Sequence, residues 1–178
     1  FIGLILLYAA VLLLGPDMTA PAFNTNLPEN TPSMLPLLFV TIACGAISGF
    51  HGLVASGTTS KQLDKETDLR FVGYFGAIGE GSLSLATIIA ACAGFATLAD
   101  WEAVYSSFGQ GGVAAFVEGG ANIISQGVGL DNEIAETLLT VMAVLFAGTT
   151  MDTGLRLQRY IFQEWGNIYN ISWMQKAL

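Results

Sequence analysis

The chain has 178 residues, of which 53% are hydrophobic and only 11% are charged, and its mean hydropathy is +0.60. Such a composition excludes an ordinary soluble domain and predicts an integral membrane protein of the all-α class. The six Lys and Arg residues and the formal net charge of −8 argue against nucleic-acid binding.

The first apolar stretch covers residues 1–14 and ends at Gly15 and Pro16. It begins at Phe1 without a methionine, and it lacks the basic region and the cleavage site of a signal peptide. We therefore expect the end of a transmembrane helix in an internal piece of a longer chain. Residues 15–33 are rich in proline and polar turn formers, which predicts an ordered loop outside the membrane.

The second predicted span, residues 34–56, starts as an apolar run and then fills with glycine and hydroxyl residues around the single histidine, His51. Each glycine weakens a helix and exposes backbone that lipid cannot hydrogen-bond. We therefore expect the glycine-rich part to face protein or a water-filled path, either packed closely against another helix or broken. Residues 57–70 carry the densest charge and are predicted to form a short loop.

Two further spans are predicted, which makes about four transmembrane helices in all. Residues 71–98 are long enough to cross the hydrocarbon with tilt or a break at their glycines. Residues 132–156 form the last span, with Asp131 as its N-cap residue. Residues 100–131, between these spans, contain no long apolar run, so we expect an extramembrane or interfacial segment with one short amphipathic helix at 113–125.

The basic residues predict the orientation of the spans. They fall in only two regions, as Lys61, Lys65 and Arg70 and as Arg156, Arg159 and Lys176. Because positive residues remain in the cytoplasm, segments 57–70 and 157–178 are predicted to be cytoplasmic, and segments 15–33 and 100–131 to lie outside. The aromatic residues of segment 157–178 are typical of a helix at the membrane interface.

Three ionisable residues, His51, Glu80 and Asp152, lie within apolar stretches. Counted from the cytoplasmic loops, each is two or three helical turns from the inner face, which is compatible with one shared layer. Because charge is costly in a bilayer, such groups usually mark a substrate or proton path, and a histidine exchanges protons near neutral pH.

Each of the three residues also has a purely structural interpretation. His51 as a neutral ring in a packed helix contact is about as plausible as a transport role, and Glu80 as a buried protonated or hydrogen-bonded carboxyl is a weaker alternative. The structural interpretation is strongest for Asp152, which forms an ordinary helix-face pair with Arg156 if both lie on one helix.

The predicted substrate and proton path contains, besides His51, Glu80 and Asp152, small and hydroxyl residues of the same stretches: Gly45, Ser48, Gly49, Ser56, Thr58, Thr59, Thr149 and Thr150. No soluble catalytic motif is present, and a single histidine cannot supply a two-histidine metal site. Cys44 and Cys92 have no close-spaced partner. We expect neither an enzyme, nor a metal, nor an organic cofactor.

Three blocks of the sequence resemble the carbon starvation protein A family: PLLFVTIACGAISGFHGLVASGTTSKQL, VGYFGAIGEGSLSLATIIA and FAGTTMDTGLRLQRYIFQEW. The resemblance extends roughly from Asn24 to Trp165. Two departures from the family pattern are conservative, Gly52 in place of a serine and Gly154 in place of an alanine. These two departures bear on the shape of the substrate pocket, but they do not argue against membership of the family.

The resemblance implies a piece of a larger transporter bundle in the bacterial inner membrane, with multiple passes. Members of the family are described as uptake transporters under nutrient limitation, either of peptides or of pyruvate with protons. The implied partners are membrane lipid, a small peptide or carboxylate substrate and the remaining transmembrane helices of the full-length chain, with the proton as coupling ion. Unpaired backbone groups and half-helix N-termini at a broken, glycine-rich span suit a carboxylate, which both substrate types carry.

Two other classes of function remain alternatives to the transporter. The first is a membrane sensor or structural subunit that transports nothing, in which the buried polar residues only pack helices. The second is an intramembrane enzyme.

Overall fold

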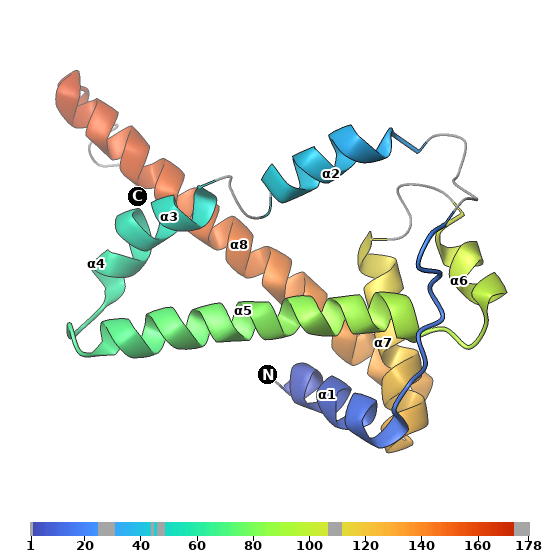
Figure 1. Cartoon of the computed structure of the whole chain (residues 1–178). Helices are drawn as coiled ribbons and strands as arrows, with labels where there is room; N and C mark the ends of the chain where they lie inside the picture. The colour runs from blue at the N-terminus through green and yellow to red at the C-terminus, as the bar shows by residue number, and fades with distance from the viewer. Residues whose placement is uncertain (1, 25–30, 44, 46–48, 107–111, 173–178) are drawn as a thin grey trace. The chain divides into compact units, whose positions relative to one another are not determined.

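The computed structural model describes residues 2–24, 31–43, 45, 49–106 and 112–172. Throughout these residues the regular structure is helical and no strand occurs, which confirms the all-α class. In chain order the helices are α1 (Ile2–Leu14), α2 (Met34–Ile42), α3 (Phe50–Val54), the π-helix η2 (Ala55–Thr59), α4 (Ser60–Gln62), α5 (Asp68–Ala93), α6 (Leu98–Val104), α7 (Gly112–Val128) and α8 (Asn132–Ile168), as labelled in Figure 1.

Two helices, α5 and α8, are long and apolar enough to cross a membrane, while α1 is a shorter apolar helix. Most side chains in the apolar windows of α5 and α8 are exposed. A core helix of a soluble protein would bury them, so both helices suit a lipid or helix-bundle environment. The number of four spans stays a prediction.

The chain divides into two compact units, residues 1–32 with 73–144 and residues 33–72 with 145–178. In the first unit α7 occupies the centre of the apolar core. The buried residues of that core come from α1, α5, α7 and α8: Leu7, Ala10, Ala86, Ala90, Phe116, Ala121, Ile123, Ile124, Ala135 and Leu139. Figure 1 shows α1 beside α7, and the two helices contact each other extensively.

Glycines allow α7 to approach three neighbouring helices closely. A Cβ atom at Gly119 would collide with the carbonyl oxygen of Ala90 on α5. At Gly120 it would lie 2.6 Å from a methyl carbon of Leu139 on α8, and at Gly127 it would lie 2.7 Å from the carbonyl oxygen of Ala10 on α1. The small residues therefore let the backbones touch, as in packed membrane helices.

The segment after α1 is held to the C-terminal end of α5. The backbone N–H groups of Thr19 and Ala20 both donate to the carbonyl of Cys92, at 2.9 and 3.0 Å, and the Thr19 hydroxyl donates to the carbonyl of Phe95 at 2.6 Å. The last carbonyls of a helix have no partner inside it. Residues from the predicted outer loop 15–33 thus provide partners for the end of α5.

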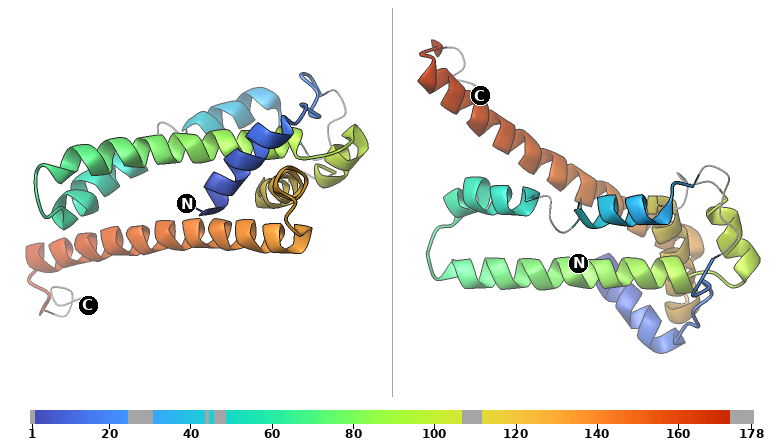
Figure 2. Two further views of the ribbon diagram at one scale, coloured as in Figure 1. Left: turned by 90° about the horizontal axis from the view of Figure 1, so that it is seen from below. Right: turned by 45° about the horizontal axis from the view of Figure 1, so that its top comes forward.

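Two side chains complete this cap. The indole N–H of Trp101, on α6, donates to the carbonyl of Ala91 at 3.0 Å, and the amide of Asn122, on α7, donates to the carbonyl of Gly94 at 3.0 Å. Both views in Figure 2 show α6 beyond this end of α5. A pocket of about 280 Å³ lies here, and Asp17, Phe95 and Gln126 contribute to its lining.

The second unit contains α2, α3, η2, α4 and the C-terminal part of α8. The predicted span 34–56 is not one helix, because α2 ends at Ile42 and α3 begins at Phe50 after Gly49, which has φ +76°. The described backbone is thus interrupted at Gly49, which agrees with one of the two alternatives that the sequence left open. The cytoplasmic loop predicted at 57–70 is largely helical, since η2 and α4 continue to Gln62 and α5 already begins at Asp68.

The bounds of the other helices differ from those of the predicted segments. The helix within 71–98 ends at Ala93, where Gly94 interrupts it, and α6 begins at Leu98. The amphipathic helix predicted at 113–125 is present within α7, but its apolar face belongs to the core of the first unit. The helix predicted for 132–156 continues without a break to Ile168.

Candidate functional site

The interruption in the glycine-rich segment depends on the backbone of Gly49. Its φ of +76° lies in the left-handed region, which residues with a Cβ atom rarely adopt. No described atom lies within 4 Å of the position of an added Cβ. Conformation, and not lack of space among the described residues, therefore requires glycine at this position.

The chain then passes through α3 into the π-helical turn η2. The N–H of Ser60 donates to the carbonyl of Ala55, five residues earlier, and the Ser56 hydroxyl donates to the carbonyl of Gly52 at 2.9 Å. Single π turns within helices occur often at functional sites, because the widened turn presents groups that an α-helix would use internally. The predicted path residues Ser56, Thr58 and Thr59 all lie in this turn.

Thr58 is the buried polar residue of the turn. It is only 3% exposed, and within the described part of the chain its hydroxyl has no hydrogen-bond partner. A buried hydroxyl without a partner costs free energy, so such a group usually has a partner in the functional state, such as water, an ion or a ligand. Thr58 is therefore a strong candidate among the predicted path residues.

The π turn and α4 pack against α8 within the second unit. An added Cβ at Gly57 would lie 3.2 Å from a methyl carbon of Leu157, and the Lys61 ammonium lies 4.3 Å from the centroid of the Tyr160 ring. The ammonium over the ring is a cation–π contact. Through these contacts, the turn that holds Thr58 and the side chain of Lys61 both lie against α8.

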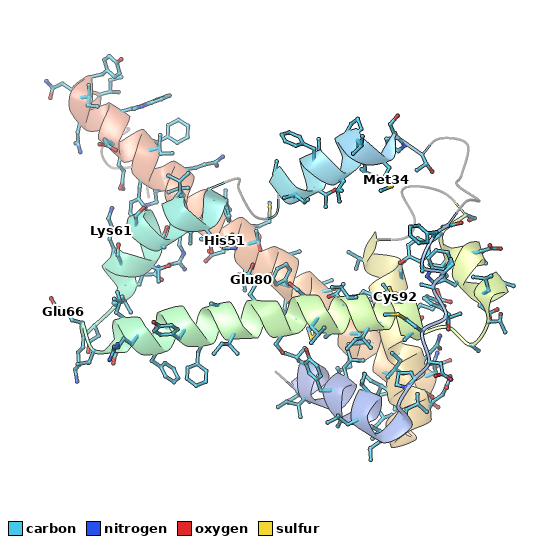
Figure 3. The ribbon with its side chains drawn as sticks, in the orientation of Figure 1. Met34, His51, Lys61, Glu66, Glu80 and Cys92 are labelled. Carbon is cyan, nitrogen blue, oxygen red and sulfur yellow. The ribbon has the colours of Figure 1, made fainter. Side chains whose placement is uncertain are left out.

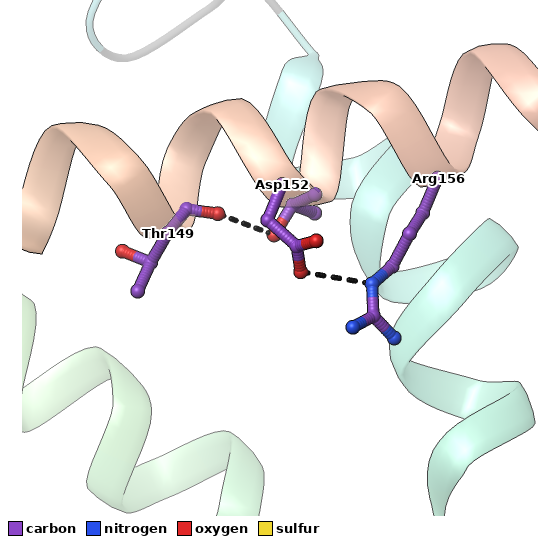
Figure 4. Close-up of polar contacts among 4 residues, drawn as sticks. Thr149, Asp152 and Arg156 are labelled. Atoms are coloured by element: carbon purple, nitrogen blue, oxygen red, sulfur yellow. Dashed lines mark hydrogen bonds and ion pairs between the residues drawn. The ribbon is translucent and has the colours of Figure 1, made fainter.

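The polar side chains of α8 form hydrogen bonds within the helix itself. The hydroxyls of Thr149 and Thr150 both donate to the carbonyl of Phe146, at 2.9 and 3.0 Å. One turn later the Arg156 Nε donates to the Asp152 carboxylate at 2.8 Å, as Figure 4 shows. The predicted pairing of Asp152 with Arg156 is confirmed. Both side chains are half exposed or more, so the pair adds little to stability.

A pocket of about 340 Å³ lies on this face, lined by Asp152, Arg156, Arg159 and Tyr160. This volume is in the range of small-molecule sites. Asp152 and Arg156 neutralise each other, whereas Arg159 forms no ion pair with any described carboxylate. The pocket is therefore positively charged.

The predicted ionisable residues lie in different units. His51 lies on α3 of the second unit, with its ring edge-on to Phe50 at 5.7 Å between centroids, and Asp152 lies on α8 of the same unit. Glu80 lies on α5 (Figure 3), in the part that belongs to the first unit, and its backbone carbonyl accepts a hydrogen bond from the Ser84 hydroxyl at 3.0 Å. The shared layer of these residues stays a prediction.

The remaining predicted path residues are Gly45 and Ser48. Gly45 is exposed, and an added Cβ there would meet no described atom within 4 Å. Ser48 lies outside the described residues.

Sequence reasoning missed three residues of this site, Lys61, Arg159 and Tyr160. The two basic residues served only to predict orientation. The signal for Arg159 and Tyr160 was their spacing of three and four residues from Arg156, which places side chains on one helix face. No local pattern connects Lys61 with Tyr160.

Among the described residues outside the two long apolar helices, the phenol of Tyr105 is perturbed by its surroundings. Burial raises the pKa of the Tyr105 phenol, and the charge of Cys92 raises it further. The ring packs against Trp101 at 4.7 Å between centroids. Tyr105 follows α6 and therefore belongs to the cap at the end of α5 and not to the pocket on α8.

Comparison with known proteins assigns the family. The family model described as carbon starvation protein CstA matches residues 1–105, more than half of the chain. The chain belongs to the CstA family. The match includes the Gly49 interruption, the π turn and all of α5, and it confirms the resemblance found in the sequence.

Several relatives in the CstA family are similar to this chain. Peptide transporter CstA of Helicobacter pylori strain ATCC 700392 / 26695 is 31% identical over 216 residues, covering 94% of this chain and 31% of the relative. Peptide transporter CstA of Campylobacter jejuni is 43% identical over 97 residues, covering 51% of this chain and 14% of the relative. Pyruvate/proton symporter BtsT of Escherichia coli K12 is 41% identical over 95 residues, covering 51% of this chain and 13% of the relative.

The chain thus spans about a third or less of the length of these CstA relatives. No solved structure matches the chain.

Proposed function

We propose that the protein to which this chain belongs is a secondary active transporter that takes up peptides or a small carboxylate such as pyruvate with protons. The observation that carries the proposal is membership of the CstA family, in which relatives are named peptide transporter and pyruvate/proton symporter. Nutrient limitation is the condition that the family name implies.

The geometry of the second unit supports this proposal. Transporters bind substrates where helices are interrupted, because the interruption leaves backbone groups without intrahelical partners. Gly49 interrupts the helical segment, and Thr58 holds a buried hydroxyl without a partner in the described chain. The positive pocket on α8 suits the negative charge that pyruvate and peptides share.

The proposed location is the bacterial inner membrane, with multiple passes and with segments 57–70 and 157–178 in the cytoplasm. Its support is the exposed apolar surface of α5 and α8 and the distribution of basic residues. A cysteine at Glu118 should react with an impermeant reagent from outside, and a cysteine at Asp64 only after permeabilisation. The reverse pattern would exclude this orientation.

The deciding experiment is uptake of labelled pyruvate and of a labelled dipeptide into proteoliposomes that contain the full-length protein. A proton-coupled transporter accumulates one of them against a gradient, and an uncoupler abolishes the accumulation. A sensor or structural subunit shows no uptake above that of empty liposomes, which would refute the proposal.

A further inference from the structure

We infer that Arg159, together with Lys61 held against Tyr160, forms a subsite that binds the carboxylate of the transported substrate at the cytoplasmic end of its path. The inference rests on the proposed function and on the predicted orientation of α8.

The charges of the side chains that line the pocket on α8 do not balance. Arg156 is paired with Asp152 at 2.8 Å, so this pair brings no net charge. Arg159 and Lys61 have no ion pair with a carboxylate among the residues described. Two positive charges therefore remain on this part of the second unit, and an anion can compensate them.

An aromatic ring connects the pocket with the Lys61 side chain. The Tyr160 ring lines the same pocket as Arg159 and also contacts the Lys61 ammonium at 4.3 Å, so this ring connects the charge on α4 with the pocket on α8. A guanidinium binds a carboxylate through two parallel hydrogen bonds, and an aromatic wall suits the short apolar part of such a ligand. These features fit a small organic carboxylate better than a fully hydrated inorganic anion.

This part of α8 also contacts the π turn. Gly57 approaches Leu157, three residues before Tyr160, and its neighbour Thr58 holds the buried hydroxyl without a partner. A substrate that leaves the interrupted segment would therefore reach a helix that carries unpaired positive charge. The residues lie on the side that the basic residues assign to the cytoplasm.

The experiment uses the full-length protein and measures binding and transport separately. Binding of labelled pyruvate to the purified protein is compared with binding of pyruvamide, its uncharged amide. Counterflow in proteoliposomes then gives the half-saturating pyruvate concentration on the cytoplasmic and on the outer side. The variants are Arg159→Gln, Arg159→Lys and Lys61→Gln. The control is Arg70→Gln, which removes a base of the same predicted face that does not line the pocket.

We expect Arg159→Gln to raise the cytoplasmic half-saturating concentration roughly tenfold, in line with a lost charge-assisted hydrogen bond, and to abolish the preference for pyruvate over pyruvamide. Arg159→Lys should recover part of the affinity, because it keeps the charge but not the planar fork. Arg159→Gln should leave the outer half-saturating concentration unchanged, and Arg70→Gln should leave both half-saturating concentrations unchanged. Equal cytoplasmic half-saturating concentrations for Arg159→Gln and wild type would overturn the inference. An increase in Arg70→Gln as large as that in Arg159→Gln would also overturn it.

Anionic lipid is the competing ligand for these basic groups, so the comparison is repeated in vesicles of phosphatidylcholine alone. If the effect of Arg159→Gln disappears there, the group binds a lipid headgroup and the inference is wrong. Transport without any dependence on Arg159 overturns only the subsite. Arg159-dependent pyruvate binding without transport supports the subsite and overturns the proposed transporter. Absence of both binding and transport overturns both.

Discussion

The side-chain amide of Asn122, on α7, donates a hydrogen bond of 3.0 Å to the carbonyl oxygen of Gly94, the first residue after α5. In the same place Gly94 and Gly119 approach so closely that a Cβ atom on Gly94 would overlap the Gly119 backbone. The end of one long apolar helix is thereby fixed to the central helix of the first unit. This relationship joins residues that are 28 positions apart.

Asn122→Ala should destabilise the protein by about 1–2 kcal/mol, because it leaves a partly buried carbonyl without its donor. The melting temperature of the purified protein in detergent measures the effect. Gln158→Ala, which removes an exposed amide on α8, is the control and should change stability little. Equal melting temperatures for Asn122→Ala and wild type would show that this bond does not secure α5.

Gly119→Ala should destabilise the protein by about 1–3 kcal/mol or prevent correct folding, because its Cβ would collide with the Ala90 carbonyl oxygen. Gly76→Ala is the matched control, since it lies inside α5 and its Cβ would meet no described atom within 4 Å. There, alanine should be neutral or stabilise the helix by up to about 1 kcal/mol. Thermal unfolding and the yield of monodisperse protein distinguish the two variants.

Gly49→Ala should insert normally into the membrane and lose most transport, because a Cβ atom makes the φ of +76° unfavourable by about 1–2 kcal/mol. Asparagine tolerates this conformation, so Gly49→Asn should retain more uptake than Gly49→Ala. Close packing of another helix against Gly49 would give the reverse order, since asparagine is larger than alanine. Uptake per inserted molecule in proteoliposomes decides between the two explanations.

Thr58→Val should leave stability unchanged or raise it slightly, because it replaces a buried hydroxyl that lacks a partner by an apolar group of the same shape. Pyruvate uptake should nevertheless fall, since the hydroxyl is then missing from the path. Thr59→Val tests the neighbouring hydroxyl on a less buried side chain. If Thr58→Val lowers the melting temperature and leaves uptake intact, the hydroxyl has a structural partner and no role in transport.

Glu80→Gln should preserve substrate counterflow and abolish proton-driven accumulation, because the amide keeps the shape but cannot exchange a proton. His51→Gln should flatten the dependence of uptake on pH near neutrality. Asp152→Asn should affect coupling less than Glu80→Gln does, because Asp152 already pairs with Arg156, and its effect on stability should be small, because both side chains are half exposed or more. Accumulation against a gradient by Glu80→Gln, with normal pH dependence, would exclude the proton-relay role of Glu80.

Local features were predictable from the sequence because they depend on residues close together in the chain. Asp131 caps α8 as predicted, since its carboxylate accepts the N–H of Glu133 at 2.9 Å. Asp152 and Arg156 form the predicted pair one turn apart. The helical class follows from composition, and the interruption at Gly49 follows from the density of glycine.

The central position of α7 was not predictable in this way. Its apolar residues are separated by Gly119, Gly120 and Gln126, so no long apolar run marks it as a core helix. The packing role of these small residues is evident only from the helices that contact them, as Ala90 contacts Gly119. A hydropathy pattern reports how apolar a face is, but not how closely two backbones approach.

The sequence by itself determined the membrane class, the family and the capping and pairing contacts within single helices. Only the tertiary structure decided that Thr58 is buried without a partner, that α7 lies at the centre of its unit, and that Lys61 meets Tyr160. The physical reason is the distance along the sequence over which each kind of interaction acts. Helix periodicity and capping act over three or four residues, whereas burial and the charge balance of a pocket depend on which distant helices pack together.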